Sequence, residues 1–399
     1  MEFFHNPNID FLGKKWYFIA FSLIFSISGL LSIFFWHGIP LGIDFRGGTE
    51  VQVKFTSTPD DKAIRAAMDR AGLHDAKLQP LEPASSNVEL INLPITETNE
   101  QALDRGKNLI ISALEGSTPA GKQDLNNSSV LALQNYLLER DPSHAGTNAK
   151  DVYATQAQNI VNFRDKTKGG VLNSLNELNG TVEPAVIASL SDSFFLSNFH
   201  VQDVQIVGPQ VGGQLRGQAI RAVGYSLAGM LIYLAFRFEL IYGIAAVITV
   251  FHDTLITVGA FSLTNKDISL TVIAAILTLV GYSNNDTIVV FDRIRENLKL
   301  MRREKLSDIV NRSINQTLSR TVLTAGLTFL TVLALYLFGG EVLNGFSFAL
   351  VIGILIGTYS SIAIAAPILV AYQDWRSTRN QTAGVAKSNR QTQEKAKVS

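Results

Sequence analysis

The stretch VGYSNNDTIVVFDRIREN, residues 280–297, ends a long apolar run, residues 268–291, that is uncharged until Asp286. It places Asn284, Asn285 and Asp286 in a row inside that run. A hydrocarbon core roughly 30 Å thick needs about 20 apolar residues in a helix, so the run is long enough to span a membrane. An acid at the centre of such a span costs about 2.5–3.5 kcal/mol even on a lenient insertion scale, and such groups usually face the interior of a helix bundle. The stretch therefore predicts a polytopic helical membrane protein with an ionisable site inside it.

Bulk composition agrees with this class and excludes several others. The 399 residues are 47% hydrophobic and 17% charged, and the mean hydropathy is +0.19. A formal net charge of zero predicts no nucleic-acid partner. The absence of cysteine excludes a disulfide scaffold, a thiolate metal site and a cysteine nucleophile. No catalytic constellation, metal motif or cofactor motif is recognisable, so we expect a protein that is not an enzyme and uses no cofactor.

Six apolar runs predict six membrane spans. The first carries no charge, and its long N-terminal flank without a small-residue cleavage site predicts a retained anchor, not a signal peptide. Buried helices of a soluble protein would show polar faces, which these runs mostly lack. The glycine pairs Gly213/Gly217 and Gly353/Gly357 predict close helix contacts, within the chain or with a partner. The predicted spans are 16–36, 219–236, 240–263, 268–291, 321–338 and 346–372.

Lysine and arginine predict the orientation of the spans. The short loops on one side, TNKD and GGEVLNG, contain only Lys266. Basic residues crowd the other side, in the N-terminus 1–15, the turn after the second span, the loop between the fourth and fifth spans, and the tail 374–399. We therefore expect both termini in the cytoplasm and residues 37–217 outside, and the lack of cysteine fits a bacterial envelope protein.

The exported segment predicts an α+β, ferredoxin-like domain. Strand and helix patterns follow in the order β-α-β-β-α-β, from GIDFRGGTEVQVKF at residues 42–55 to a last strand at 200–207. Asp44 and Arg46 within GIDFRGG suggest a ligand site, but the three glycines there are better explained by a sharp turn between span and strand. Residues 116–198 form a polar insertion, which the sequence allows to be either a mobile subdomain or mostly disordered.

Three of the spans carry ionisable groups. His252 and Asp253 lie in the third span, Asp286 in the fourth and Arg320 where the fifth begins. Asp286 and Arg320 are each 18 residues from the outer ends of their spans (286 − 268 and 338 − 320), so both lie roughly 27 Å deep. Asp253 is 10 residues from the outer end of its span (263 − 253), roughly 15 Å deep and near the midplane. We therefore expect the Asp286 carboxylate and the Arg320 guanidinium at the same level.

Polar side chains accompany these charges, and a stripe of hydroxyls that leads to an acid can hold water and pass protons. We predict a proton relay of Asp286, Arg320, His252 and Asp253. Three alternatives remain: Arg320 as a snorkelling residue at the interface, the hydroxyls as helix-packing groups, and Asp286 as a static ion-pair partner of Arg320. The predicted supporting path consists of Thr278, Tyr282, Ser283, Asn284, Asn285, Gln316 and Thr324.

Three classes of function were considered for two acids in two spans. An intramembrane aspartyl protease is excluded, because its Tyr-Asp and Gly-x-Gly-Asp motifs are absent and an arginine beside the acid favours the ionised form. A proton-driven transporter of small molecules or lipids remains possible on residue physics alone. So does a proton-driven machine that acts on polypeptides through its external domain.

Five motifs, in order, resemble the SecF family of bacterial protein-export subunits. They are GIDFRGGTEV, VGPQVGGQLRGQAI, FHDTLITVG, VGYSNNDTIVVFDRIREN and TLSRTVLTAGLTFLTVLALYLFGG. The resemblance covers nearly the whole membrane region and both ends of the external segment, but it does not extend to 116–198. Asn284 stands where an apolar residue is commoner in the family, which would make this site wetter.

The resemblance implies a function and a set of partners. Family members pair with SecD as two six-span halves, similar to the proton-driven transporters of the RND superfamily. They associate with the SecYEG channel and use the proton-motive force to complete polypeptide translocation across the lipid bilayer, and YajC is a further candidate partner. The family's functional acid and arginine fall on Asp286 and Arg320, and its His-Asp pair falls on His252 and Asp253.

Overall fold

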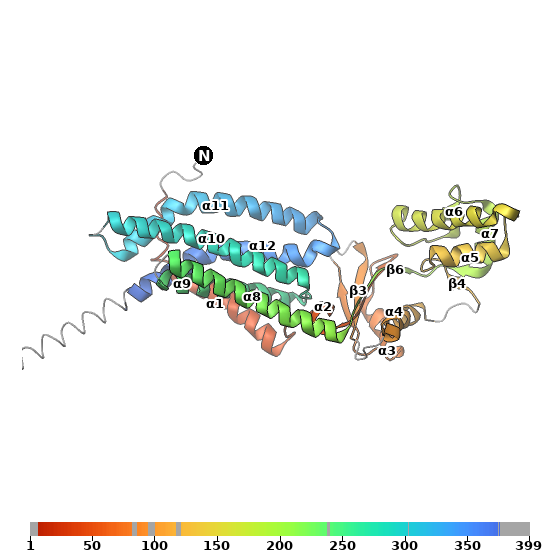
Figure 1. Ribbon diagram of the computed structural model, residues 1–399, viewed down its shortest axis with the longest axis horizontal. Coiled ribbons are helices and arrows are strands. Elements are labelled where there is room, and N and C mark those ends of the chain that lie inside the picture. The colour runs from red at the N-terminus through yellow and green to blue at the C-terminus, as the bar shows by residue number, and fades with distance from the viewer. Residues whose placement is uncertain are drawn as a thin grey trace, which may run out of the picture. The chain divides into compact units, whose positions relative to one another are not determined.

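The computed structural model describes residues 7–81, 86–94, 100–116, 121–237, 240–301, 303–373 and 375 (Figure 1). The chain folds as two compact units, one of Gly42–Arg216 and one of Met1–Leu41 together with Gly217–Ser399. Arg302 and, apart from Trp375, the predicted basic tail 374–399 lie outside the described residues.

Within the described residues, six helices are long and apolar enough to cross a membrane, as the sequence predicts. They extend well beyond the predicted spans in three places, the start of α8, the end of α10 and the start of α11, because polar turns continue the apolar helices. The basic residues Arg293, Arg295 and Lys299 therefore lie on a helix and not in a loop, and Arg312 lies on the next helix. The helices are α1 (Lys15–Phe35), α8 (Pro209–Arg237), α9 (Leu240–Thr264), α10 (Leu270–Leu300), α11 (Leu306–Phe338) and α12 (Asn344–Ser360), with the short helix η5 (Glu341–Leu343) before α12 and the π-helical segment η6 (Ser361–Ala365) after it.

Helices α9, α10 and α12 form the centre of the helical unit. In the most apolar 18-residue stretch of each of these helices, 50% of the residues are buried, whereas the share is 17% in α1 and α11 and 6% in α8. Helix α1 packs on α9, and α11 packs on α10 and α12. We call the end where α1 begins, α10 ends and α11 begins the basic end, because Lys14, Lys15, Arg293, Arg295 and Lys299 lie there.

Glycines permit two of these helix contacts. Gly29 of α1 and Gly259 of α9 face each other so closely that a Cβ on Gly29 would lie 2.9 Å from the Gly259 Cα. A Cβ on Gly353 would lie 2.5 Å from methyl carbons of Leu279 of α10. The predicted close contact at Gly353 and Gly357 is thus present within the chain. At Gly213 and Gly217, in contrast, an added Cβ would meet no described atom within 4 Å.

The second unit contains the predicted ferredoxin-like sheet. Its strands lie in the order β2-β3-β1-β6 with antiparallel neighbours. Apolar residues of β1 and β3, such as Val51 and Ile91, pack with Ile64 and Met68 of α3 and Ile110 of α4 in one core. The elements are α2 (Ile43–Arg46), β1 (Gly48–Phe55), α3 (Asp61–Arg70), β2 (Lys77–Pro80), β3 (Val88–Leu93), α4 (Glu100–Glu115) and β6 (Phe199–Val207).

The GIDFRGG stretch is a tight junction between backbone segments. Gly47 and Gly48 have φ of +76° and +143°, which residues with a Cβ rarely adopt. A Cβ on Gly47 would lie 2.7 Å from the Cα of Pro209. This geometry favours the structural interpretation of the glycines over a ligand site.

The insertion is folded from residue 121 onwards, so the disordered alternative is wrong for 121–198. Amphipathic helices pack around Leu133, Tyr153, Ile160 and Leu190, all fully buried. The physical reason is that these apolar residues, although sparse in the sequence, converge in one core. The elements are β4 (Gln123–Asp124), α5 (Val130–Arg140), η2 (Gly146–Asn148), α6 (Ala149–Asn162), η3 (Phe163–Thr167), η4 (Leu175–Leu178), α7 (Pro184–Ser193) and β5 (Phe194–Phe195), with β4 and β5 parallel.

A buried polar network joins the insertion to β6. The Asn126 side chain donates to the carbonyls of Leu172 and Ser197 at 3.1 and 2.7 Å. The His200 Nδ1 lies 2.5 Å from the Asn126 carbonyl. Burial lowers the pKa of His200, and the nearby Arg164 guanidinium lowers it further.

Candidate functional site

Asp253 of α9 is the centre of a buried polar cluster inside the helical unit. The residue is 0% exposed. Its Oδ2 accepts hydrogen bonds from Ser283 Oγ of α10 at 2.6 Å and from Ser360 Oγ of α12 at 2.8 Å. Its Oδ1 lies 2.9 Å from His252 Nδ1. We call these four residues the Asp253 hub; it links the three central helices through one carboxylate.

Local sequence explains how the helices approach each other here. Gly357 lies one turn before Ser360, and a Cβ at this position would lie 3.0 Å from the Ser283 Cβ. The π-helical segment η6 begins directly after Ser360, and Ser361 Oγ lies 2.9 Å from Thr287 Oγ1 of α10. Wide helical turns of this kind occur often at functional sites, because they shift side chains out of the regular α-helical register.

Asp286 lies one turn further along α10 and is 3% exposed. It is the third residue after Ser283, which corresponds to a rise of about 4.5 Å along the helix. Both Asp253 and Asp286 therefore face the interior at neighbouring levels of the bundle. The Tyr282 hydroxyl is buried one turn before Asp286 on the same helix.

Arg320 interacts with Asp286 electrostatically, without direct contact between the two side chains. Within the described part of the chain, no ion pair shorter than 4.0 Å joins them. Arg320 is exposed on α11 while Asp286 is buried on α10. A static ion pair, one of the alternatives left open by the sequence, is thus not the arrangement seen here. The guanidinium lies on an outer face of the single chain.

Four polar atoms of this region are buried without a hydrogen-bond partner among the described residues. They are His252 Nε2, the Tyr282 hydroxyl, Asn284 Oδ1 and Thr321 Oγ1. Buried polar groups are nearly always paired with protein or water, so an unpaired one indicates a strained, wet or functional position. His252 is itself a predicted relay residue, and the other three lie within four residues of Asp286 or Arg320 in the sequence.

The other predicted path residues do not contact the acids through their side chains. The Thr278 hydroxyl donates to the Ala274 carbonyl and the Thr324 hydroxyl to the Arg320 carbonyl, both within their own helices. Gln316 accepts from Asn297 at 2.9 Å. For these hydroxyls the helix-packing alternative fits the geometry better than a continuous relay.

Sequence reasoning placed Ser283 beside Asp286, but the structure places it on Asp253. It missed Ser360, Ser361 and Thr287, because serines and threonines are common in membrane helices and their spacing alone does not select an acid on another helix. Gly357 is the one sequence signal that could have pointed to Ser360. Among the described residues no group of three histidines or acids is suited to hold a metal ion.

Comparisons with known proteins agree with the motifs. The profile of the C-terminal part of the SecD/SecF protein-export membrane proteins matches residues 186–375, and the SecD/SecF GG motif matches 34–59. The chain is 62% identical over 388 residues to the protein translocase subunit SecF of Koribacter versatilis, with 96% of each chain covered. It belongs to the SecF family.

Further relatives and a solved structure support the same assignment. The chain is 37% identical over 375 residues to the translocase subunit SecF of Calditerrivibrio nitroreducens, covering 96% of that protein. It also matches the crystal structure of SecDF, a translocon-associated membrane protein from Thermus thermophilus, with a TM-score of 0.64 and 29% identity. That match covers 92% of this chain and 39% of the SecDF chain. The chain is accordingly a multi-pass membrane subunit of the protein-export machinery.

Proposed function

We propose that this SecF-family subunit couples the proton-motive force to late steps of polypeptide translocation, and that Asp286 is its titrating group. The observation that carries the proposal is a buried carboxylate inside α10 that Arg320 influences without a direct ion pair. A close buried ion pair between Arg320 and Asp286 would keep the Asp286 carboxylate ionised, whereas a more distant guanidinium allows this carboxylate to gain and lose a proton.

The cycle that we propose begins with proton arrival at Asp286 from the outer side. Protonation removes the negative charge that attracts the Arg320 guanidinium, so α10 and α11 repack. Release of the proton to the cytoplasm restores the first state. One charge that crosses the membrane supplies about 2.3 kcal/mol per 100 mV, which is adequate for a change of side-chain partners.

The Asp253 hub has a different role in this proposal. Its carboxylate is enclosed by three donors from three helices, so we assign it to holding α9, α10 and α12 in register near the titrating level. His252, whose second nitrogen is buried and unpaired, would be the member that exchanges a proton with the Asp286 region.

The proposed partners follow from the relatives. This chain covers 39% of the SecDF chain, so a partner is expected to supply the remainder, and we propose SecD. The exposed position of Arg320 on α11 is consistent with a second half that covers this face. We further propose SecYEG, YajC and the emerging polypeptide as partners, with both termini in the cytoplasm and the unit Gly42–Arg216 outside.

Transport of small molecules or lipids is the alternative for an RND-like proton site. The relatives are named as protein translocase subunits, which favours export. A SecD-like reading frame next to this gene would favour it further.

The proposal is tested with Asp286→Asn in a reconstituted export assay with and without a proton gradient. We expect the gradient-dependent part of export to disappear and gradient-independent export to persist. Asp292→Asn is the matched control, because Asp292 is on the same helix but 58% exposed. Full gradient dependence in Asp286→Asn would refute the relay. Arg320→Lys then tests whether charge alone suffices, since lysine lacks the planar fork of arginine.

A further inference from the structure

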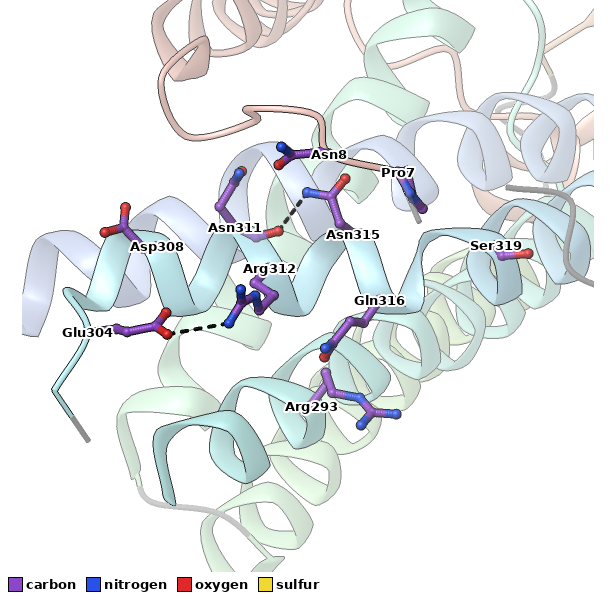
Figure 2. A pocket seen from close by; sticks show the side chains of 10 residues that line it. All are labelled: Pro7, Asn8, Arg293, Glu304, Asp308, Asn311, Arg312, Asn315, Gln316 and Ser319. Atoms are coloured by element: carbon purple, nitrogen blue, oxygen red, sulfur yellow. Dashed lines mark hydrogen bonds and ion pairs between the residues drawn. The ribbon is translucent and has the colours of Figure 1, made fainter. Parts of the chain in front are cut away.

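The N-terminal segment 7–14, which we call the strap, is bound along α11 at the basic end. It precedes α1 directly and runs past Asn311 and Asn315, which are one helical turn apart (Figure 2). The Ile9 N–H donates to Asn315 Oδ1 at 2.9 Å, and Asn315 Nδ2 donates to the Ile9 carbonyl at 2.9 Å. The Phe11 N–H donates to Asn311 Oδ1 at 2.8 Å, and Asn311 Nδ2 donates to the Ile9 carbonyl at 3.0 Å.

These four bonds form a specific attachment. Each asparagine uses both its acceptor and its donor on the strap backbone, as a neighbouring strand of a sheet would. With the strap bound, Asn315 is only 6% exposed. Leu12 continues the contact by packing into the bundle core with Val310, Ile314 and Leu369.

Two cavities with polar linings border the strap. One of about 810 Å³ is lined by Pro7 and Asn8 of the strap and mainly by α11. The other, of about 420 Å³, is lined by later strap residues and by the start of α11. Figure 2 shows Asn311 and Asn315 pointing at the strap, while Arg312 turns away and pairs with Glu304 at 3.4 Å. The attachment therefore depends on the two asparagines and not on the charged residues around them.

The strap connects the attachment site on α11 to helix α1. Arg320 lies five residues beyond Asn315 on the same helix, and α1 follows the strap after Lys14. Helix α1 packs on α9, whereas α11 packs on α10 and α12. The strap is thus hydrogen-bonded to the helix that carries Arg320 and is covalently continuous with α1, whose far end leads into the exported segment.

We propose that Asn311 and Asn315 are positioning residues: through the strap they tie α11 to α1, so that a shift of α11 during the proton cycle is transmitted to α1. This inference rests on the proposed function of Asp286 and Arg320. It predicts that release of the strap uncouples the proton gradient from export, while assembly and gradient-independent export continue.

The test uses the full chain with two ways to release the strap. The first is the double variant Asn311→Ala/Asn315→Ala. The second is Ile9→Pro/Phe11→Pro, which removes both donor N–H groups and leaves α11 unchanged, so it guards against misfolding of the helix. Asn8→Ala and Arg312→Ala are matched controls, because both residues line the same cavity but donate no bond between strap and α11.

Strap release is measured separately from function. The chain contains no cysteine, so a single cysteine at Leu12, a strap residue that is only 9% exposed, reports strap release by its rate of reaction with a membrane-impermeant maleimide in inverted vesicles. Loss of two or more hydrogen bonds should raise this rate roughly tenfold. In the same variants we expect the gradient-dependent part of export to fall severalfold, with both controls unchanged.

Two results would overturn the inference. One is a strap that labels faster while export keeps its full gradient dependence, which would reduce the strap to a passive contact. The other is unchanged labelling in both double variants, which would show that the asparagines do not hold the strap. Asp286→Asn in parallel separates the two proposals, because its loss of gradient dependence would stand even where strap release has no effect.

Discussion

The bond between Ser360 and Asp253 offers a quantitative test of the Asp253 hub. Ser360→Ala removes one hydroxyl that donates at 2.8 Å to a fully buried carboxylate, and it leaves the Ser283 bond at 2.6 Å in place. A hydrogen bond to a charged group contributes about 1.5–3 kcal/mol in soluble proteins. Between membrane helices the measured average is about 0.6 and the maximum about 1.7 kcal/mol. Because this acceptor is buried and shared by three donors, we expect about 1–1.5 kcal/mol, towards the upper end of the membrane range.

A double-mutant cycle isolates this bond. The variants are Ser360→Ala, Asp253→Asn and their combination, and the free energy of unfolding is measured by denaturant titration in lipid–detergent bicelles. The matched control is Ser347→Ala, since Ser347 is equally buried on α12 but donates to carbonyls of its own helix region, Leu343 and Asn344. Distant sites are additive within about 0.3–0.5 kcal/mol. A coupling energy for Ser360 no larger than that of Ser347 would refute the proposed geometry.

Three further predictions concern helix contact and pH. Gly259→Leu should push α1 away from α9, because even a Cβ at this position would lie 2.8 Å from the Gly29 Cα. We expect this overpacking to lower the free energy of unfolding by about 1–3 kcal/mol in the same assay. Gly281→Leu is the control, since no described atom lies within 4 Å of a Cβ added there. Burial raises the pKa of Glu89, on β3, from 4.5 to about 7, so the folded unit binds this proton more tightly and loses stability as pH rises between these values. Glu89→Gln should remove that loss of stability, which is on the order of 2–3 kcal/mol. The measurement is the protection of β1 and β3 amides from hydrogen exchange between pH 5 and 8. An equal fall of this protection in both proteins would contradict the prediction. Burial lowers the pKa of His200 below its usual 6.5, so the stability of the folded unit should fall as the pH drops through 6.5. His200→Gln should reduce this loss of stability at acid pH, measured by hydrogen exchange of the β6 amides. A loss as large as in the unchanged protein would argue against a buried neutral imidazole.

The sequence was sufficient for the six spans and for the order of the exported domain. The length of an apolar run and the spacing of alternating residues are local properties, so they predict element type without knowledge of packing. The depth count also put Asp286 and Arg320 near one level, because helical rise per residue is constant. Element ends were less well predicted: α10 continues to Leu300 and α11 begins at Leu306, since polar helical turns carry no hydropathy signal.

Tertiary structure alone decided which side chains meet. Ser283 lies next to the Asp286 turn in sequence, yet its hydroxyl donates to Asp253, because the rotation of α10 about its axis is set by packing against α9 and α12. Ser360 and Asn315 were invisible for the same reason: each acquires its role only from a partner more than 100 residues away. The sequence by itself determined that acidic side chains, Asp253 and Asp286, would lie inside a bundle of apolar helices. The tertiary structure decided their neighbours, because hydrogen-bond partners depend on helix rotation and on the close approach that Gly357 permits, and neither is encoded in any single segment.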